Sequence, residues 1–93
     1  RGAILNINDA SFTYQENRIE LTKNEYRILQ VLMEQKGSVI SRDILMTKLW
    51  ETDSYIDDNT LTVNVTRLRK RLEDAGLEQF IITKKGMGYL VEG

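Results

Sequence analysis

Residues 57–75, which read DDNTLTVNVTRLRKRLEDA, decide the fold of this chain. Their apolar side chains recur at spacings of four, three and four residues, at Leu61, Val65, Leu68 and Leu72. At about 100° per residue, this spacing places them on one stripe of a helix. The segment therefore predicts a helix that turns its leucines toward a core.

The opposite face of this helix is polar and positive. It carries Asn59, Val63, Thr66, Arg67 and Lys70, flanked by Thr62 and Arg69 on one side and by Asn64 and Arg71 on the other. Residues 59–71 contain four cations and no acid, whereas the whole chain has 13 Lys and Arg against 14 Asp and Glu. The positive charge is therefore local. Val63 gains nothing from water there, which suggests contact with an apolar group such as a thymine methyl in a DNA major groove.

A second interpretation of this face stays open at this point. Arg69 with Glu73, and Lys70 with Asp74, have the spacing of weak ion pairs along a helix. Part of the charge could therefore belong to an ordinary solvated surface.

Size and composition narrow the possible classes of protein. A chain of 93 residues, 41% hydrophobic and 29% charged, predicts one globular domain. Neither a membrane span nor a signal peptide is expected, and the start at Arg1 suggests a piece of a longer polypeptide. The lack of Cys fits a reducing cytoplasm. Without His or Cys, we expect no enzyme activity, no metal and no cofactor.

The remaining patterns predict an α+β order of elements. Apolar residues alternate with polar ones in three short antiparallel strands, at Leu5 and Ile7, Phe12 and Tyr14, and Ile19 and Leu21, with breaks at 9–11 and 16–17. Two helices follow, at 23–36 and 42–50. A β-hairpin with a basic tip is expected at 80–84 and 88–92, where Gly86 and Gly88 are interpreted as turn residues.

Capping residues set the expected helix boundaries. Thr22 and Glu25 have the spacing of a capping box, and Ser41 precedes the second helix. Asp57 or Asp58 is expected to cap the third helix, while Gly37 and Gly76 stop the first and third. The residues expected to face the core are Tyr26, Leu29, Leu32 and Met33 in the first helix and Ile44, Leu45 and Leu49 in the second.

This order predicts a winged helix-turn-helix domain that spans residues 1–93. In such a domain the third helix enters the major groove, and the earlier helices support it and meet the DNA backbone. The cationic face lies on that third helix, and the hairpin tip would add Lys84 and Lys85 beside it.

Four motifs carry a resemblance to a known family. KLWE at 48–51, DDNT at 57–60, LTVNVTRLRKRLE at 61–73 and TKKGMGYLVE at 83–92 are similar to the C-terminal DNA-binding domain of OmpR/PhoB-type two-component response regulators. The detail resembles regulators of Gram-positive cell-envelope stress and antimicrobial-peptide resistance. The match covers essentially the whole chain.

The resemblance implies a set of contacts to double-stranded DNA. Base contacts are expected from Val63, Arg67, Asn59 and Thr66, and backbone contacts from Trp50, Asn64, Arg69, Lys70, Arg71, Thr83 and Tyr89. The wing would contribute Lys84, Lys85 and Met87 near the minor groove. Well-known members carry Arg or His at the positions of Asn59, Asn64 and Thr66, and often Arg at that of Lys85. Affinity and specificity are therefore expected to differ.

The resemblance also implies partners beyond this chain. A sensor histidine kinase would phosphorylate a receiver domain, and two copies would then bind a direct repeat as a dimer. The loop 51–56 would meet RNA polymerase, although a plain surface turn suits its composition better. Trp50 and Tyr89 could instead serve packing. The alternative function is a winged-helix protein-interaction module that does not bind DNA, which predicts few cations on the third helix.

Overall fold

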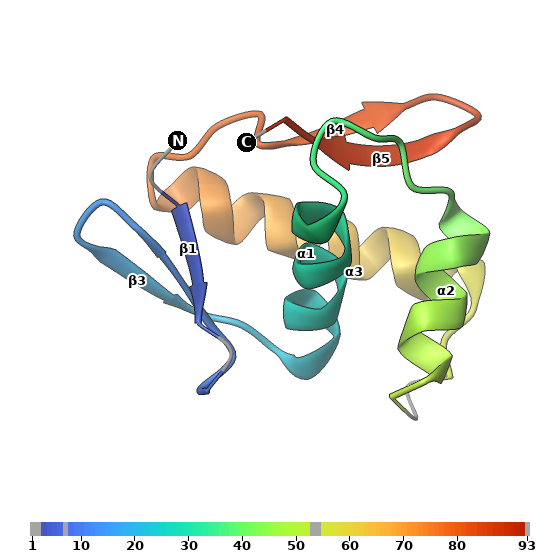
Figure 1. Ribbon diagram of the computed structural model, residues 1–93, viewed down its shortest axis with the longest axis horizontal. Coiled ribbons are helices and arrows are strands. Elements are labelled where there is room, and N and C mark those ends of the chain that lie inside the picture. The colour runs from blue at the N-terminus through green and yellow to red at the C-terminus, as the bar shows by residue number, and fades with distance from the viewer. Residues whose placement is uncertain (1–2, 7, 53–54, 93) are drawn as a thin grey trace.

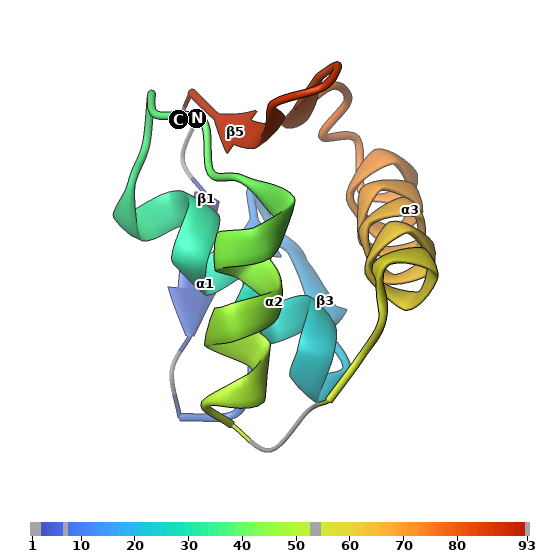
Figure 2. The same ribbon diagram turned by 90° about the vertical axis from the view of Figure 1, so that its right-hand side faces the viewer.

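The computed structural model describes residues 3–6, 8–52 and 55–92. Along the chain the elements are β1 (Ala3–Asn6), β2 (Ser11–Tyr14), β3 (Asn17–Glu20), α1 (Lys23–Glu34), α2 (Arg42–Trp50), α3 (Asp58–Asp74), β4 (Ile81–Lys84) and β5 (Gly88–Val91). The three-stranded sheet lies at one end of the molecule and α2 at the other, with α3 running between them (Figure 1). The β4–β5 hairpin lies above both α2 and α3 (Figure 2).

The N-terminal strands form an antiparallel meander in the order β1-β2-β3, as the alternation predicts. Phe12 pairs with Leu5 on one side and Ile19 on the other, is fully buried, and lies 5.9 Å from Phe80 between ring centroids. Ser11, predicted in a break, instead begins β2, where its hydroxyl donates to Asp9 Oδ1 at 2.6 Å. Ile7 lies outside the described residues. The sheet thus contributes Phe12 to the core, next to Phe80.

Both hydrogen bonds of the capping box are present at the start of α1. Thr22 Oγ1 accepts from the Glu25 backbone N–H at 3.2 Å, and Glu25 Oε1 accepts from the Thr22 N–H at 2.9 Å. Leu29 and Leu32 are fully buried, as predicted. Ile28 is buried as well, so α1 turns a wider face to the core than its predicted stripe.

Helix α2 has the predicted bounds and cap, with Ser41 Oγ accepting from the Ile44 N–H at 3.1 Å. The inward placement of Ile44 was wrong, because its side chain is 49% exposed. Leu45 and Leu49, four residues apart, already form the single buried stripe of this short helix. Ile44 lies about 100° around the helix from Leu45, on its outer side.

Helix α3 confirms the prediction on which the fold depends. Asp57 is its N-cap and accepts from the Thr60 N–H at 2.8 Å. All four residues of the apolar stripe are at most 1% exposed. The core stripe and the polar face of the helix are therefore separated as the spacing predicts.

The wing is joined to Ile40, two residues before α2. Ile40 and Tyr89 exchange backbone hydrogen bonds of 2.8 and 3.0 Å. Gly86 lies in the turn at φ +76°, and Gly88 begins β5, as the expected strand bounds have it. Turn geometry is not what requires a glycine at position 88. A Cβ at Gly88 would lie 2.0 Å from the carbonyl oxygen of Ile40. Gly88 is thus needed for close approach of two backbones.

Candidate nucleic-acid interface

The outer face of α3 is open to solvent along its first half. Asn59, Val63, Thr66 and Arg67 are all exposed, and the Val63 side chain is 44% exposed. Val63 and Arg67 are one helical turn apart on the same face. Arg67 makes no hydrogen bond or ion pair with any described residue. This pair presents an aliphatic group and a guanidinium side by side.

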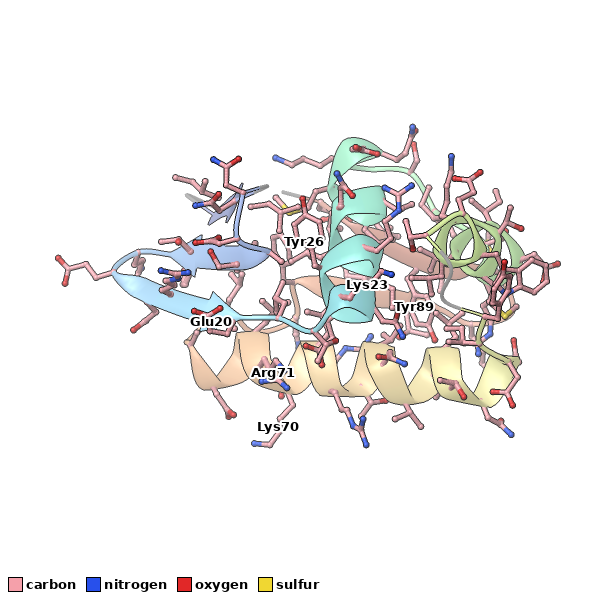
Figure 3. The ribbon with its side chains drawn as sticks, turned by 90° about the horizontal axis from the view of Figure 1, so that it is seen from below. Glu20, Lys23, Tyr26, Lys70, Arg71 and Tyr89 are labelled. Carbon is pink, nitrogen blue, oxygen red and sulfur yellow. The ribbon has the colours of Figure 1, made fainter. Side chains whose placement is uncertain are left out.

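The other three cations of α3 are bound within the protein. Arg69 Nη2 donates to Thr83 Oγ1 at 2.8 Å and to the Ile81 carbonyl at 3.2 Å. Lys70 Nζ lies 3.1 Å from Asp74 Oδ1, as the spacing predicts, and extends away from α1 (Figure 3). Among the described residues no ion pair joins Arg69 to Glu73, because Arg69 turns toward β4 instead.

Arg71 is held by a buried carboxylate. Its Nε lies 2.9 Å from Glu25 Oε1, and the Glu25 residue is fully buried. Glu25 therefore closes the capping box of α1 and ties α1 to α3. The sequence signals the first role of Glu25, but the second depends on how the helices pack.

Asn64 lies largely inside the protein. It is 9% exposed, and its Nδ2 donates back to the Thr60 carbonyl at 2.8 Å. The Asn64 side-chain amide therefore has little exposed surface with which to contact a DNA phosphate. The flank position predicted for Asn64 therefore falls on the inner side of α3.

Trp50 and Tyr89, for which two roles stayed open, differ in exposure. Trp50 is 48% exposed at the end of α2, so core packing does not account for it. Tyr89 is 6% exposed, and its hydroxyl accepts from Arg42 Nη1 at 2.6 Å. It joins the wing to Ile40 and to Arg42 at the start of α2.

The wing tip shares a cleft with the first turns of α2 and α3. The cleft measures about 480 Å³, and its walls include Lys84, Lys85, Met87, Asp58 and Arg42. Met87 is 62% exposed, and both lysines are exposed. The structure thus brings the predicted wing residues beside the N-terminal end of α3. Thr83, a predicted DNA-backbone contact in β4, is exposed and accepts a hydrogen bond from Arg69.

Arg42 is the site residue that the sequence analysis missed. It is the first residue of α2, where the positive end of the helix dipole disfavours a cation. That position was the available signal, because a cation there needs an anionic partner. Its Nε donates to Asp58 Oδ1 at 3.0 Å, and this hydrogen bond is the main reason that the pKa of Arg42 is raised.

Other kinds of site find no support in the part of the chain that is described. Among residues 3–6, 8–52 and 55–92, no three acidic side chains gather where they could hold a metal ion. No described helix is both long and apolar enough to cross a membrane. The loop 51–56 includes residues 53 and 54, which lie outside the described residues.

Three helices, an N-terminal antiparallel sheet and a C-terminal hairpin define a winged helix-turn-helix domain, as the sequence predicts. Residues 15–91 match the family model described as "Transcriptional regulatory protein, C terminal". The chain therefore belongs to this family, the DNA-binding effector domains of OmpR/PhoB-type two-component response regulators.

Individual relatives agree with this assignment. The chain is 46% identical over 91 residues to the sensory transduction protein BceR of Halalkalibacterium halodurans, covering 98% of this chain and 39% of the relative. It is 42% identical over 91 residues to the response regulator protein GraR of Staphylococcus saprophyticus, covering 98% and 41%. The chain thus spans about two fifths of these relatives.

Solved structures show the same fold. The C-terminal domain of the nisin resistance regulator NsrR, described as a lantibiotic response regulator, superposes with a TM-score of 0.87 at 40% identity, covering 97% of this chain and 91% of that one. The DNA-binding domain of the response regulator AdeR, in complex with an intercistronic region, gives 0.86 at 28% identity, covering 100% and 96%.

Proposed function

We propose that this domain binds double-stranded DNA in a sequence-specific way, with α3 in the major groove and the wing near the minor groove. The observation that carries the proposal is the pair of Val63 and Arg67 on the outer face of α3. Arg67 is exposed and makes no hydrogen bond or ion pair with the described residues, so its donors are available to a base edge. The complex of the AdeR domain with DNA supports the same use of the fold.

Each side chain has a role that its chemistry suits. The Arg67 guanidinium would donate to the acceptors of a purine, and Val63 would contact a thymine methyl. Asn59 and Thr66 would complete the base-reading face. Trp50, Thr83 and Lys70 would contact phosphates, which set register without reading sequence. The tip of the wing would approach the minor groove through Lys84, Lys85 and Met87.

The net charge of -1 shapes how such a domain binds. Long-range attraction must come from the local patch, because the molecule as a whole does not attract an anion. We expect a single domain to bind weakly and with a strong dependence on salt.

For the whole protein, we propose a cytoplasmic regulator with a receiver domain phosphorylated by a sensor histidine kinase. Phosphorylation would favour a dimer on a direct repeat, and the loop 51–56 would be available to RNA polymerase. The likeness to a lantibiotic response regulator favours a role in resistance to antimicrobial peptides in Gram-positive bacteria. We propose no catalytic activity.

Selection from a random duplex library tests the proposal directly. The domain is expected to enrich one motif, and fluorescence anisotropy should show tighter binding to that motif than to a scrambled duplex. Arg67→Ala removes the proposed base-reading arginine, and Arg18→Ala is its matched control, because Arg18 is an exposed arginine on the N-terminal sheet. The control should keep the preference for the enriched motif. A library with no enriched motif would instead favour the protein-interaction module, which needs no unpaired cation on α3.

A further inference from the structure

Arg42 connects the three elements of the proposed interface. Its Nη2 donates to the Asp58 carbonyl at 2.6 Å and to Thr62 Oγ1 at 2.7 Å, both in the first turns of α3. Its Nε donates to the Asp58 carboxylate at 3.0 Å, and its Nη1 donates to the Tyr89 hydroxyl at 2.6 Å. One side chain from α2 therefore bonds to both α3 and the wing.

The geometry favours an internal role over a direct one. These four hydrogen bonds leave little of the donor capacity of the guanidinium unused. The neighbouring Asp58 also offsets its charge. A phosphate would meet a group that is already bonded and partly neutralised.

The wing has few other ties to this end of the molecule. Tyr89 and Ile40 exchange backbone hydrogen bonds, and these fix the base of the hairpin. The Arg42 guanidinium carbon also lies 5.8 Å from the centre of the Tyr89 ring, within reach of a cation–π contact. Between α3 and the wing, however, the cleft of about 480 Å³ is open beside Arg42. Arg69 joins the second half of α3 to Thr83 and Ile81 in β4. Loss of the Arg42 bridge would therefore free the wing from the N-terminal end of α3 only.

We infer that Arg42 is a positioning residue that holds the wing at a fixed place relative to the N-terminal end of α3. The helix and the wing can then reach their two grooves together. The inference rests on the proposed function for its consequence in DNA binding. The positioning itself is a property of the free protein.

The absence of Cys from the chain makes the positioning directly measurable. Spin labels on cysteines introduced as Thr66→Cys and Lys85→Cys, both exposed positions, report the distance from α3 to the wing tip without DNA. We expect one narrow distance distribution. Arg42→Met should broaden it, and Arg42→Lys should broaden it too, because an ammonium cannot bridge three partners in the planar geometry of a guanidinium.

Two further variants keep the test decisive if Arg42→Met does not fold. Tyr89→Phe and Thr62→Val each remove one hydroxyl acceptor and leave Arg42 in place. Each should broaden the distribution less than Arg42→Met. Arg18→Met, which removes an arginine from exposed ion pairs on the N-terminal sheet, should leave it unchanged.

DNA affinity, measured on the proteins without labels, gives the second readout. We expect Arg42→Lys to lower affinity for the selected duplex about tenfold. A change of this size corresponds to the loss of one charged hydrogen bond. An unchanged distance distribution in every Arg42 variant would overturn the inference. Wild-type DNA affinity in Arg42→Lys would also count against it, because it would show that the positive charge alone matters. If the wild type bound no DNA, the proposed function would fail, while the distances would still decide the positioning role.

Discussion

Helix α3 divides just after Arg67 into a first half, residues 58–67, and a second half, residues 68–74, whose polar side chains have different contacts. In the first half, the outer residues Val63 and Arg67 are exposed, and Arg67 has no partner among the described residues. In the second half, Lys70 is paired with Asp74, and Arg71 with the buried Glu25. Arg69, between them, is bonded to β4.

This difference shows that cations clustered on one helix need not share one role. The solvated-face interpretation holds for Lys70, whose pair with Asp74 is exposed. It does not apply to Arg71, whose partner is a buried carboxylate. Arg67 is exposed and has no ion pair among the described residues, so its donors are available to a ligand. The helix therefore divides into a half that reads DNA, as we propose, and a half that holds the domain together.

Removing Arg71 should give the largest effect and tests the structural half. Arg71→Met leaves the Glu25 carboxylate buried without its cation, and its Oε2 has no partner among the described residues. We expect the free energy of unfolding to fall by about 3 kcal/mol. Urea denaturation at pH 7 measures it.

A double variant provides the control for this prediction. Glu25→Gln with Arg71→Met removes both charges, keeps a group able to accept from the Thr22 N–H, and should recover part of the loss. Glu25→Gln alone should cost less than Arg71→Met, because Arg71 is 44% exposed and can turn to water. An Arg71→Met protein as stable as the wild type would erase the division between the two halves.

Removing Arg67 should change DNA recognition and leave stability alone. Arg67→Ala is expected to lose about 1–3 kcal/mol of discrimination between the selected and scrambled duplexes. Its free energy of unfolding should stay within about 0.5 kcal/mol of the wild type, since no hydrogen bond or ion pair among the described residues is lost. Lys85→Ala is the comparison, because it should weaken binding to both duplexes more evenly. Anisotropy titrations with an unchanged preference in Arg67→Ala would remove Arg67 from its role.

The sequence predicts the inner face of α3 better than the outer one. The spacing of Leu61 and its three partners identifies the core stripe, because only an inward helix face gives that period. The caps Thr22, Ser41 and Asp57 follow from local chemistry and are also found as predicted.

The misses come from contacts between distant elements. Glu25 and Arg71 are 46 residues apart, and Arg42 and Tyr89 are 47 apart, so no local pattern reveals either pair. Ile44 was assigned inward because it is apolar, but a nine-residue helix buried only one narrow stripe. The resemblance assigned Arg67 to bases and Arg71 to the DNA backbone, but it gave no sign that Arg71 pairs with the buried Glu25.

Removing Lys70 should have a small effect and tests the solvated part of the second half. Lys70→Ala breaks an exposed pair four residues apart, and such pairs contribute about 0.3–0.5 kcal/mol. The loss should shrink as salt is raised. Asp74→Ala should match it in stability but not in DNA binding, where only loss of the cation lowers affinity. Equal affinities for the two variants would show that Lys70 does not contact phosphate.

The smallest effect is expected from a change of Asp57, the N-cap of α3, at the start of the half of the helix that we propose contacts DNA bases. The hydrogen bond from Thr60 lowers the pKa of Asp57 below its ordinary value of 3.8. A lowered folded pKa means that the charged cap stabilises the fold above the ordinary pKa, and that this contribution is lost as pH falls through the lower, folded value. Asp57→Asn retains a capping oxygen but cannot titrate, so its stability should fall less than that of the wild type below pH 3.8. Urea denaturation of both proteins from neutral to acid pH gives the difference. Parallel curves would mean that the cap holds the start of α3 equally well without its charge.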